Sequence, residues 1–396
     1  MDVTSGTMLA KLQNAAPYNL FFTTIPKSPE TLEQANAITF TDLLCPSLGV
    51  LKCSLQINFI IDFKWLMEHK IGIYIYEDNS LRVVVSTANL YYEDWNHYNQ
   101  GLWLSPSCRQ LPEDSSEEDG ESPTGFKSCL LNYLKHYNLP VVTPWIDYVK
   151  RADFSEIKVF LVTSVPGFHY PGAPGSHMHH VGEILTRHCS LPTGSDSEGP
   201  KSWKIIAQAS SMGSFSKSPT DWLQGTLLRS LAAHQQTQSH SDPNLTLNVI
   251  FPTIDNVNNG HFGAESAGCL SYSKQTHEKQ KWLHDYLYQW KADGLCRTRV
   301  IPHIKTYCRV SPCHKKLAWF FITSANISQA AWGGKMQRKE KRVYVRSCEA
   351  GVMFLPEFFG EDYFEIAPNG ENRKIFPFMY DLPLTKYKSS DYPWCK

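Results

Sequence analysis

The chain has 396 residues, of which 42% are hydrophobic, 13% aromatic and 19% charged, and this composition excludes an intrinsically disordered protein. Its 38 basic residues balance 38 acidic ones, so the net charge indicates neither a nucleic-acid nor a membrane partner, although a local basic groove stays open. The 11 cysteines are odd in number, the start at Met1–Asn14 lacks an apolar run, and no stretch of about 18 apolar residues follows. These features predict a soluble protein with reduced thiols in the cytosol or nucleus.

Short apolar runs alternate with helical patterns along the chain, which predicts an α/β architecture whose strands are buried on both faces. In chain order, the expected strands are Leu55–Ile61, Ile71–Tyr76, Leu81–Val85, Val159–Val162, Trp203–Ala207, Leu247–Phe251, His303–Tyr307, Trp319–Thr323 and Val352–Leu355. The expected helices are Phe126–Tyr137, Trp222–Ala233 and Thr276–Trp290. Polar or Pro- and Gly-rich composition predicts solvated loops at Glu113–Glu121, Pro171–Gly175, Pro192–Pro200 and Ala233–Asn244.

Two parts of the chain share four landmarks in the same order, which predicts an internal duplication. In each part a strand ends in Ala-Asn, a tryptophan follows six residues later, and an apolar hexapeptide bounded by Gly and Pro comes next. A lysine precedes the asparagine by 19 residues in the first part and by 21 in the second. We expect the two halves to pack as pseudo-twofold partners around a cleft. The landmarks are Lys70, Asn89, Trp95 and Gly101–Pro106 in the first part, and Lys305, Asn326, Trp332 and Gly351–Pro356 in the second.

The second copy contains three polar side chains suited to phosphoryl chemistry. His303 and Lys305 stand two residues apart on an expected strand, where residues i and i+2 share a face, and Asn326 ends a neighbouring strand. An imidazole can transfer a proton or attack phosphorus, while an ammonium and an amide stabilise negative charge on phosphate oxygens. An ordinary strand with one surface histidine is the alternative that this pattern leaves open.

The motifs resemble those of the tyrosyl-DNA phosphodiesterases of the phospholipase D superfamily. The resemblance rests on His303–Tyr307 (HIKTY), Thr323–Gly333 (TSANISQAAWG), Ser86–Trp95 (STANLYYEDW) and Ala207–Phe215 (AQASSMGSF), and it spans nearly the whole chain from about residue 40 to residue 394. It implies an α/β fold of two pseudo-symmetric phospholipase D-like halves, residues 1–152 and 153–396, with mixed sheets flanked by helices. The active site is then expected at the interface of the halves.

By this resemblance, the expected activity is a DNA-repair phosphodiesterase that hydrolyses 3′-phosphotyrosyl adducts without a metal or other cofactor. One histidine attacks the phosphorus and forms a phosphohistidine; the other protonates the leaving tyrosine and then activates water. The implied partners are single- and double-stranded DNA 3′ ends and the tyrosyl peptide of a topoisomerase, with no membrane. The resemblance further implies a monomer located in the nucleus, with the cytoplasm as a second location.

The resemblance also implies a role for each matching residue. His303 is the acid/base, Lys305 and Lys70 bind phosphate, and Asn326 and Asn89 support them. Glu349 matches an acidic residue that orients a catalytic histidine. The positions that match DNA-backbone contacts are Ser328, Ser211 and Ser214, and Gln100 lies in a matching active-site motif.

The first copy departs from the family pattern at the position of its nucleophile. Two residues before Lys70 the chain has Glu68 instead of histidine, and His69 would point to the opposite face of a strand unless a bulge turns it inward. Eight residues separate Lys70 from the expected strand end at Asp62, whereas 92 separate His303 from the corresponding Ser211. We interpret this as an internal deletion near residues 62–70, from a skipped exon or a faulty gene model, which leaves the first half incomplete.

This departure leaves other functions open. A chain without its nucleophile loses orders of magnitude in rate, so a catalytically impaired isoform that only binds DNA ends or partners is the alternative function. A phospholipase-type transfer on lipids is a third, less favoured option.

His177, His179 and His180 match no common zinc spacing, and a surface loop is expected there. Trp95, Trp332 and Trp394 are candidate base-stacking platforms, but we expect Trp95 and Trp332 in the core because they follow equivalent strand ends. Lys335–Arg342 either contacts DNA phosphates or forms a solvated hairpin tip.

Overall fold

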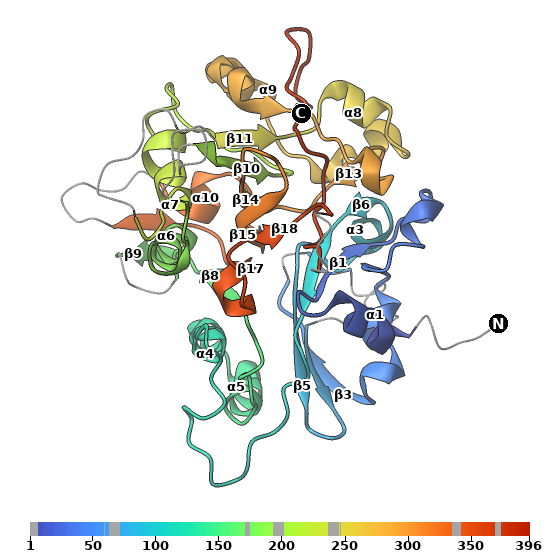
Figure 1. Ribbon diagram of the computed structural model, residues 1–396, viewed down its shortest axis with the longest axis vertical. Helices are drawn as coiled ribbons and strands as arrows, with labels where there is room; N and C mark the ends of the chain where they lie inside the picture. Colours follow the sequence, from blue (N-terminus) through green and yellow to red (C-terminus); the bar gives the residue numbers. More distant parts are fainter. Residues whose placement is uncertain are drawn as a thin grey trace. The chain divides into compact units, whose positions relative to one another are not determined.

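In a computed structural model, the chain divides into two compact units, Met1–Leu161 and Val162–Lys396 (Figure 1). The structure describes all residues except 1–6, 59, 63–71, 171–174, 193–201, 237–244, 246, 335–341 and 369–373. Within the described ranges, no helix combines the length and the apolar character needed to cross a bilayer.

The first unit is built around a mixed sheet. Its strands are β1 (Leu20–Thr23), β2 (Ala37–Ile38), β3 (Leu51–Leu55), β4 (Ile73–Tyr76), β5 (Leu81–Ser86) and β7 (Gly101–Leu104), and β6 (Tyr98–Asn99) directly precedes β7. Counted over the described residues, six strands lie in the order β2-β1-β7-β5-β4-β3. β1 and β2 are parallel and the other neighbours antiparallel, so the sheet of this unit is mixed.

The helices of the unit are α1 (Met8–Ala15), α3 (Tyr92–Asn96), α4 (Phe126–His136) and α5 (Thr143–Lys150). Helix α1, helix α3 and the 3₁₀ turns Thr41–Leu44 and Pro46–Leu48 pack with the sheet in one hydrophobic core. Phe40 packs edge-on against Trp95, with ring centroids 4.9 Å apart, and Trp95 is only 2% exposed. The expectation that Trp95 lies in the core is therefore confirmed.

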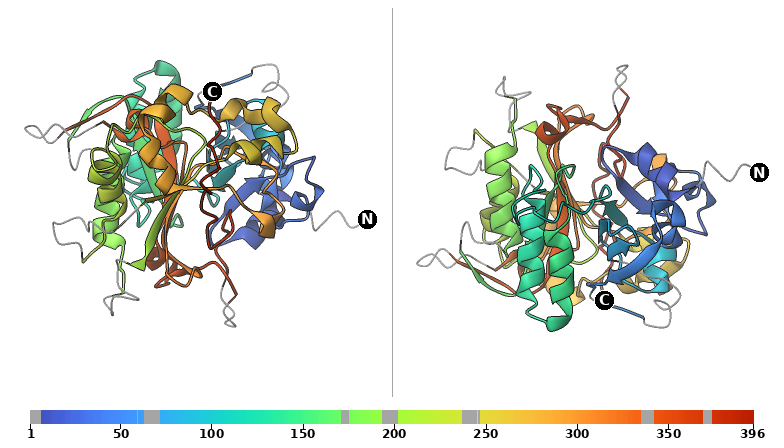
Figure 2. Two further views of the ribbon diagram at one scale, coloured as in Figure 1. Left: turned by 90° about the horizontal axis from the view of Figure 1, so that it is seen from above. Right: turned by 90° about the horizontal axis from the view of Figure 1, so that it is seen from below.

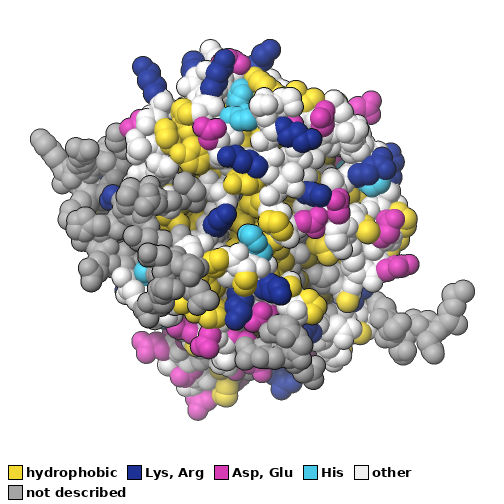
Figure 3. Space-filling model, turned by 45° about the horizontal axis from the view of Figure 1, so that its top comes forward, with side chains coloured by type: hydrophobic (Ala, Val, Ile, Leu, Met, Phe, Trp, Pro, Cys, Tyr) yellow, Lys and Arg dark blue, Asp and Glu magenta, His cyan; other side chains and the backbone are white. Residues whose placement is uncertain are grey.

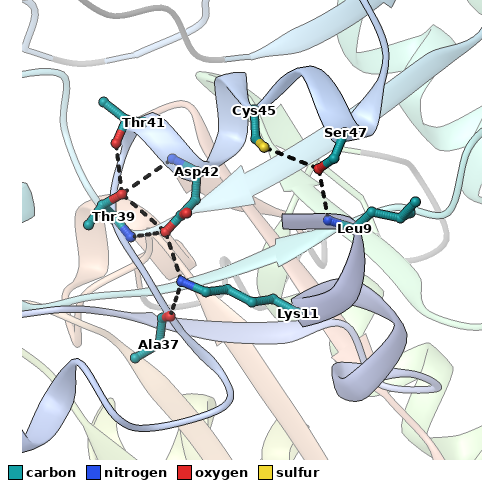
Figure 4. A network of polar contacts seen from close by, with 8 residues as sticks. All are labelled: Leu9, Lys11, Ala37, Thr39, Thr41, Asp42, Cys45 and Ser47. Atoms are coloured by element: carbon teal, nitrogen blue, oxygen red, sulfur yellow. Dashed lines mark hydrogen bonds and ion pairs between the residues drawn. The ribbon is translucent and has the colours of Figure 1, made fainter. Parts of the chain in front are cut away.

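A polar network ties α1 to the 3₁₀ turn Thr41–Leu44 (Figure 4). Lys11 Nζ donates to Asp42 Oδ2 at 3.1 Å and to the Ala37 carbonyl at 3.2 Å. The same carboxylate accepts from the backbone N–H of Thr39 at 2.7 Å. Because Lys11 and Asp42 are both largely screened from solvent, this ion pair holds α1 on the edge of the sheet more firmly than a surface pair would.

The acidic stretch 113–121 is more than the solvated loop expected from its composition. Glu121 lies at its end, and its carboxylate accepts from the backbone N–H groups of Lys127 at 2.9 Å and Ser128 at 2.8 Å. These are N–H groups of the first turn of α4, which has Gly125 at its N-cap and therefore no capping side chain of its own. The expectation was incomplete because the cap is supplied from four residues upstream of Gly125.

The second unit contains a larger mixed sheet. Its strands are β8 (Phe160–Ser164), β10 (Lys204–Gln208), β11 (Leu247–Ile250), β12 (Leu287–Tyr288), β14 (Thr306–Val310), β15 (Lys316–Thr323), β17 (Glu349–Phe354) and β18 (Phe364–Glu365); β13 is Ile301–Pro302. Among the described residues the order is β12-β11-β10-β14-β15-β17-β8, with β18 paired to β15. β10, β11 and β12 are parallel, while β10-β14-β15-β17 are antiparallel. Central strands such as β14 are buried along their whole length, as expected for a sheet covered on both faces.

Helices α6 (His177–His188) and α7 (Arg229–Leu231) lie together on one face of this sheet (Figure 2). The remaining helices are α8 (Ile254–Asn258), α9 (Lys274–Lys279) and α10 (Gln329–Trp332), and a π-helical turn, Leu223–Leu228, leads into α7. A separate two-stranded ribbon joins β9 (Gly167–His169) to β16 (Val343–Val345).

Four sequence expectations are wrong in their extent. β3 ends at Leu55, where a strand Leu55–Ile61 was expected to begin. The expected helix Thr276–Trp290 breaks after Lys279 into a 3₁₀ turn and β12, since Leu287 and Tyr288 pair with β11. The expected strand His303–Tyr307 begins only at Thr306. The histidine-rich stretch is not a loop, because Ser176 caps it as an N-cap residue and α6 starts at His177.

Candidate functional site

Thr323, the last residue of β15, connects the segments that hold the polar motifs of the second unit. Its N–H donates to the Lys305 carbonyl at 3.1 Å, and its hydroxyl donates to the Ala350 carbonyl at 3.2 Å. The same hydroxyl accepts from the Ala325 N–H at 3.1 Å and shares a 2.9 Å hydrogen bond with His177 Nε2. One threonine therefore fixes the ends of three neighbouring segments against each other.

His303 and Lys305 lie between β13 and β14 rather than on a regular strand. Their side chains are buried, with 9% and 2% of their surface exposed. Lys305 Nζ folds back and donates to the His303 carbonyl at 2.5 Å. The expected i, i+2 strand geometry is thus replaced by an irregular extended segment, in which the lysine ammonium itself helps to hold the backbone of His303.

Asn326 follows β15, and the structure fixes the orientation of its amide. Its Oδ1 accepts from the backbone N–H groups of Ser210 at 3.1 Å and Ser211 at 2.9 Å, and from the Ser210 hydroxyl at 3.2 Å. With three donors at Oδ1, the Nδ2 group must point the other way and is presented as a donor. Ser210 was not singled out from the sequence, although it adjoins Ser211 in the same motif.

Glu349, the first residue of β17, is held by hydroxyl groups and by charge. Ser324 Oγ donates to its carboxylate at 2.5 Å. Burial raises the pKa of Glu349 above its ordinary value, while hydrogen bonds from Ser324 and Ser347 and the positive charge of Lys305 oppose that shift. The carboxylate therefore lies within electrostatic reach of Lys305, and the site combines a buried cation with a half-buried acid.

The three serines expected to contact DNA lie on two loops that pack together. The Gly213 N–H donates to the Ile327 carbonyl at 3.0 Å, and Gln329 Nε2 donates to the Ser214 carbonyl at 3.0 Å. A Cβ at Gly213 would lie 3.2 Å from Ser328 Cβ, so glycine permits this close approach. Ser214 is exposed and Ser328 is half-buried at the N-cap of α10, where its hydroxyl already accepts from the helix. Ser211 is half-buried on the first of these loops.

Buried aromatic side chains support the turn before Asn326. Tyr307 donates its hydroxyl proton to the Ala325 carbonyl at 3.0 Å and accepts from Trp332 Nε1 at 3.1 Å. Trp332 is fully buried, so its expected place in the core is confirmed. Composition gave no signal for the Tyr307 contact, since it depends on two segments distant in sequence.

The first unit repeats this local geometry. Thr87 Oγ1 donates to Gln100 Oε1 at 2.8 Å and accepts from the Gly101 N–H at 3.0 Å. In the second unit, Ser324 makes the same pair of bonds to Glu349 and to the Ala350 N–H, the latter at 3.1 Å. Gln100 therefore corresponds to Glu349, and Gly101 corresponds to Ala350. The two hexapeptides had instead paired Gly101 with Gly351, one residue later.

Asn89 in the first unit is held by its backbone. Its N–H donates to Asp94 Oδ2 at 2.5 Å, and its carbonyl accepts from Trp95 Nε1 at 3.0 Å. Lys70 and His69, the remaining expected site residues of this half, lie outside the described residues.

The histidines of α6 form no metal centre. His177 is completely buried against Phe321 and Trp332, with ring centroids 5.6 Å from each. Burial lowers the pKa of His177 to about 3, so its imidazole is neutral at physiological pH. Across the part of the chain that the structure describes, no three His, Cys, Asp or Glu side chains are grouped so that they could hold a metal ion.

Comparisons with known proteins identify one family. The family model for tyrosyl-DNA phosphodiesterase matches residues 19–71 and 69–388. Tyrosyl-DNA phosphodiesterase 1 of Drosophila melanogaster is 35% identical over 446 positions, covering 99% of this chain and 76% of that protein. A probable tyrosyl-DNA phosphodiesterase of Caenorhabditis elegans is 30% identical, over 82% of this chain and 66% of that protein. A crystal structure of the yeast tyrosyl-DNA phosphodiesterase has the same fold, with a TM-score of 0.72 at 18% identity over 95% of this chain and 99% of that one.

Proposed function

The chain belongs to the tyrosyl-DNA phosphodiesterase family, a family of DNA-repair hydrolases, and we propose that it acts on DNA 3′ ends that carry a phosphotyrosyl adduct. The observation that supports this most is that Thr323 holds together the three segments that carry Lys305, Asn326 and Glu349. A buried ammonium and an oriented amide donor suit a phosphate whose charge grows in the transition state.

Each side chain then has a defined chemical task. The Lys305 ammonium and the Asn326 Nδ2 group bind the non-bridging phosphate oxygens. An imidazole of the first half attacks the phosphorus and forms the P–N bond of a phosphohistidine; as the P–O bond to the tyrosyl oxygen breaks, His303 donates a proton to that oxygen and the tyrosine leaves neutral. His303 then takes a proton from water as the water oxygen attacks the phosphorus of the phosphohistidine, which releases the 3′-phosphate. Glu349 balances the charge of Lys305 and limits its desolvation cost.

The first half supplies the nucleophile in this scheme, and there the chain departs from its family. Glu68 stands two residues before Lys70, and His69 is the imidazole nearest to the motif. The family model matches in two segments that meet at residues 69–71, and the alignment to the fly relative is 446 positions long against 396 residues of this chain. The alignment length supports residues missing from this chain relative to the fly protein, and the meeting point of the two segments supports a deletion near residues 62–70.

This departure favours a second function, in which the chain binds 3′ ends with little or no turnover. Glu68 would repel a phosphate rather than attack it. The remaining lysine, amide and serine groups of the second half would still bind the end. We further propose a nuclear location and a monomer that binds single- and double-stranded 3′ ends.

A single-turnover assay separates the two functions. A 3′-phosphotyrosyl oligonucleotide is incubated in EDTA with the chain, with His303→Ala and with His69→Ala. Release of tyrosine that is lost in both variants supports the phosphodiesterase with His69 as nucleophile. Binding of the oligonucleotide without release supports the second function. Release that His303→Ala leaves unchanged would refute the role of His303.

A further inference from the structure

The β9–β16 ribbon presents two aromatic side chains on its outer face. Phe168 and Tyr344 are cross-strand neighbours whose ring centroids lie 4.7 Å apart, and they are 49% and 45% exposed. The alternate residues Val343 and Val345 are buried. The period-two pattern therefore gives the ribbon one apolar face that packs on the protein and one aromatic face that faces solvent.

The ribbon begins at the end of the sheet where the phosphate-site residues gather. β9 follows β8 after two residues, and Ser164 at the end of β8 donates its hydroxyl proton to the Ser347 carbonyl at 3.2 Å. The Arg346 N–H donates to the Ala330 carbonyl of α10 at 2.9 Å, and α10 starts directly after Ser328. The ribbon is thus anchored both to the helix that follows Asn326 and to the segment that precedes Glu349.

The charge beside these rings is positive. The guanidinium of Arg342 lies 4.1 Å from the centroid of the Phe168 ring, and Arg346 is exposed at the other end of β16. Figure 3 shows further Lys and Arg side chains on one face of the molecule, with Asp and Glu side chains largely toward the edge of that view. A local pairing of exposed aromatic rings with arginine is the combination that binds unpaired bases and their phosphates.

A cross-strand aromatic pair also stabilises a ribbon, and that accounts for the contact between the rings. It does not account for their exposure, since the buried valines already hold the ribbon in place. A further exposed aromatic residue stands beside the pair, because Tyr170, which is 51% exposed, directly follows β9. Three exposed aromatic side chains on one short ribbon and the residue that follows it indicate a binding face.

We propose that Phe168, Tyr344 and Arg342 form a stacking platform for unpaired bases of the DNA strand whose 3′ end occupies the phosphate site. The proposal rests on the proposed function, because it needs a DNA strand anchored at Lys305 and Asn326. Glu349 is the fifth residue after Tyr344, so the chain between them spans at most about 17 Å. This is the length of about five nucleotides at 3.4 Å each. The contacted bases are therefore those a few positions upstream of the 3′ end.

The test compares oligonucleotides of two lengths with the full chain. Fluorescein-labelled single strands of about two nucleotides, too short to reach the platform, and of about twelve nucleotides, both ending in a 3′-phosphate, are titrated by fluorescence anisotropy. We expect Phe168→Leu and Tyr344→Leu each to weaken binding of the long strand by about five- to a hundredfold and to leave the short strand unchanged. Leucine keeps an apolar side chain in the ribbon, and Phe168→Trp should restore the affinity.

Tyr363→Leu is the matched control. Tyr363 also pairs with an aromatic ring, Trp203 at 5.1 Å, and has Lys316 5.6 Å above its ring, but it lies near the start of β15, the opposite end from Thr323. Equal affinity of the Leu variants and the unchanged chain for the long strand would overturn the platform. If Lys305→Met leaves the binding of the short strand unchanged, the phosphate site itself is overturned. Failure of the platform and failure of the proposed function are therefore distinguishable.

Discussion

The buried imidazole of His177 should make the second unit lose stability in acid. Its pKa is lowered to about 3 by burial, with the nearby His180 acting in the same direction, while its ordinary value is 6.5. Between these values the unfolded chain binds a proton that the folded chain does not, so stability is fully present above pH 6.5 and falls as the pH drops toward 3. At pH 5.0 the loss from this group is about 2 kcal/mol relative to pH 7.5.

The assay is urea unfolding followed by tryptophan fluorescence at pH 7.5 and 5.0, for the unchanged chain, for His177→Gln and for the exposed control His136→Gln. His177→Gln keeps a group that can bond to Thr323 Oγ1 but removes the titration. Between pH 7.5 and pH 5.0, we expect the free energy of unfolding of His177→Gln to fall by about 2 kcal/mol less than that of the unchanged chain. The control His136→Gln should lose as much as the unchanged chain. Parallel losses in the unchanged chain and His177→Gln would refute the burial of a neutral imidazole at this position.

Three further changes test other contacts. Glu121→Ala removes the carboxylate that caps α4 and should cost about 1–2 kcal/mol in urea unfolding, while Glu113→Ala in the same acidic stretch should cost nothing; equal costs would contradict the cap. Tyr307→Phe leaves a buried indole N–H and the Ala325 carbonyl without their partner, so a loss of about 1–3 kcal/mol is expected, and an unchanged unfolding midpoint would argue against this network. Because burial raises the pKa of Glu349, the folded chain holds that proton more tightly, and stability falls as the pH rises above 4.5; Glu349→Gln should flatten this fall between pH 4.5 and 7.5, and parallel profiles would show that the carboxyl is not buried.

Local sequence motifs pointed to which polar residues belong to the candidate site, but they did not predict how the side chains of those residues are arranged. The HIKTY and SAN motifs singled out Lys305 and Asn326 as candidates without any structure, because a phosphate site needs those side-chain types. They did not reveal that Lys305 turns back on the His303 carbonyl, since that bend depends on the pairing of β14 with β10 and β15. Apolar periodicity likewise predicted buried strands but not the exact strand limits.

The contacts that the sequence did not reveal all join distant segments. Thr323 and His177 are 146 residues apart, and nothing in the composition of the histidine-rich stretch indicated a buried helix start. Ser324, in contrast, stands inside the recognised motif, and comparison of its bonds with those of Thr87 gave the correspondence of Gln100 with Glu349. A one-residue register shift between two copies appears only when backbone pairing is known.

The central claim is that Lys305 and Asn326 form a site for a phosphate at a DNA 3′ end. It is tested most directly by the affinities of two short oligonucleotides that differ only in a 3′-phosphate or a 3′-hydroxyl, a measurement that does not depend on turnover. The account predicts that the 3′-phosphate strand binds about tenfold tighter, as expected for charge-assisted hydrogen bonds, and that Lys305→Met removes this preference. Equal affinity of the unchanged chain for the two strands would contradict the account.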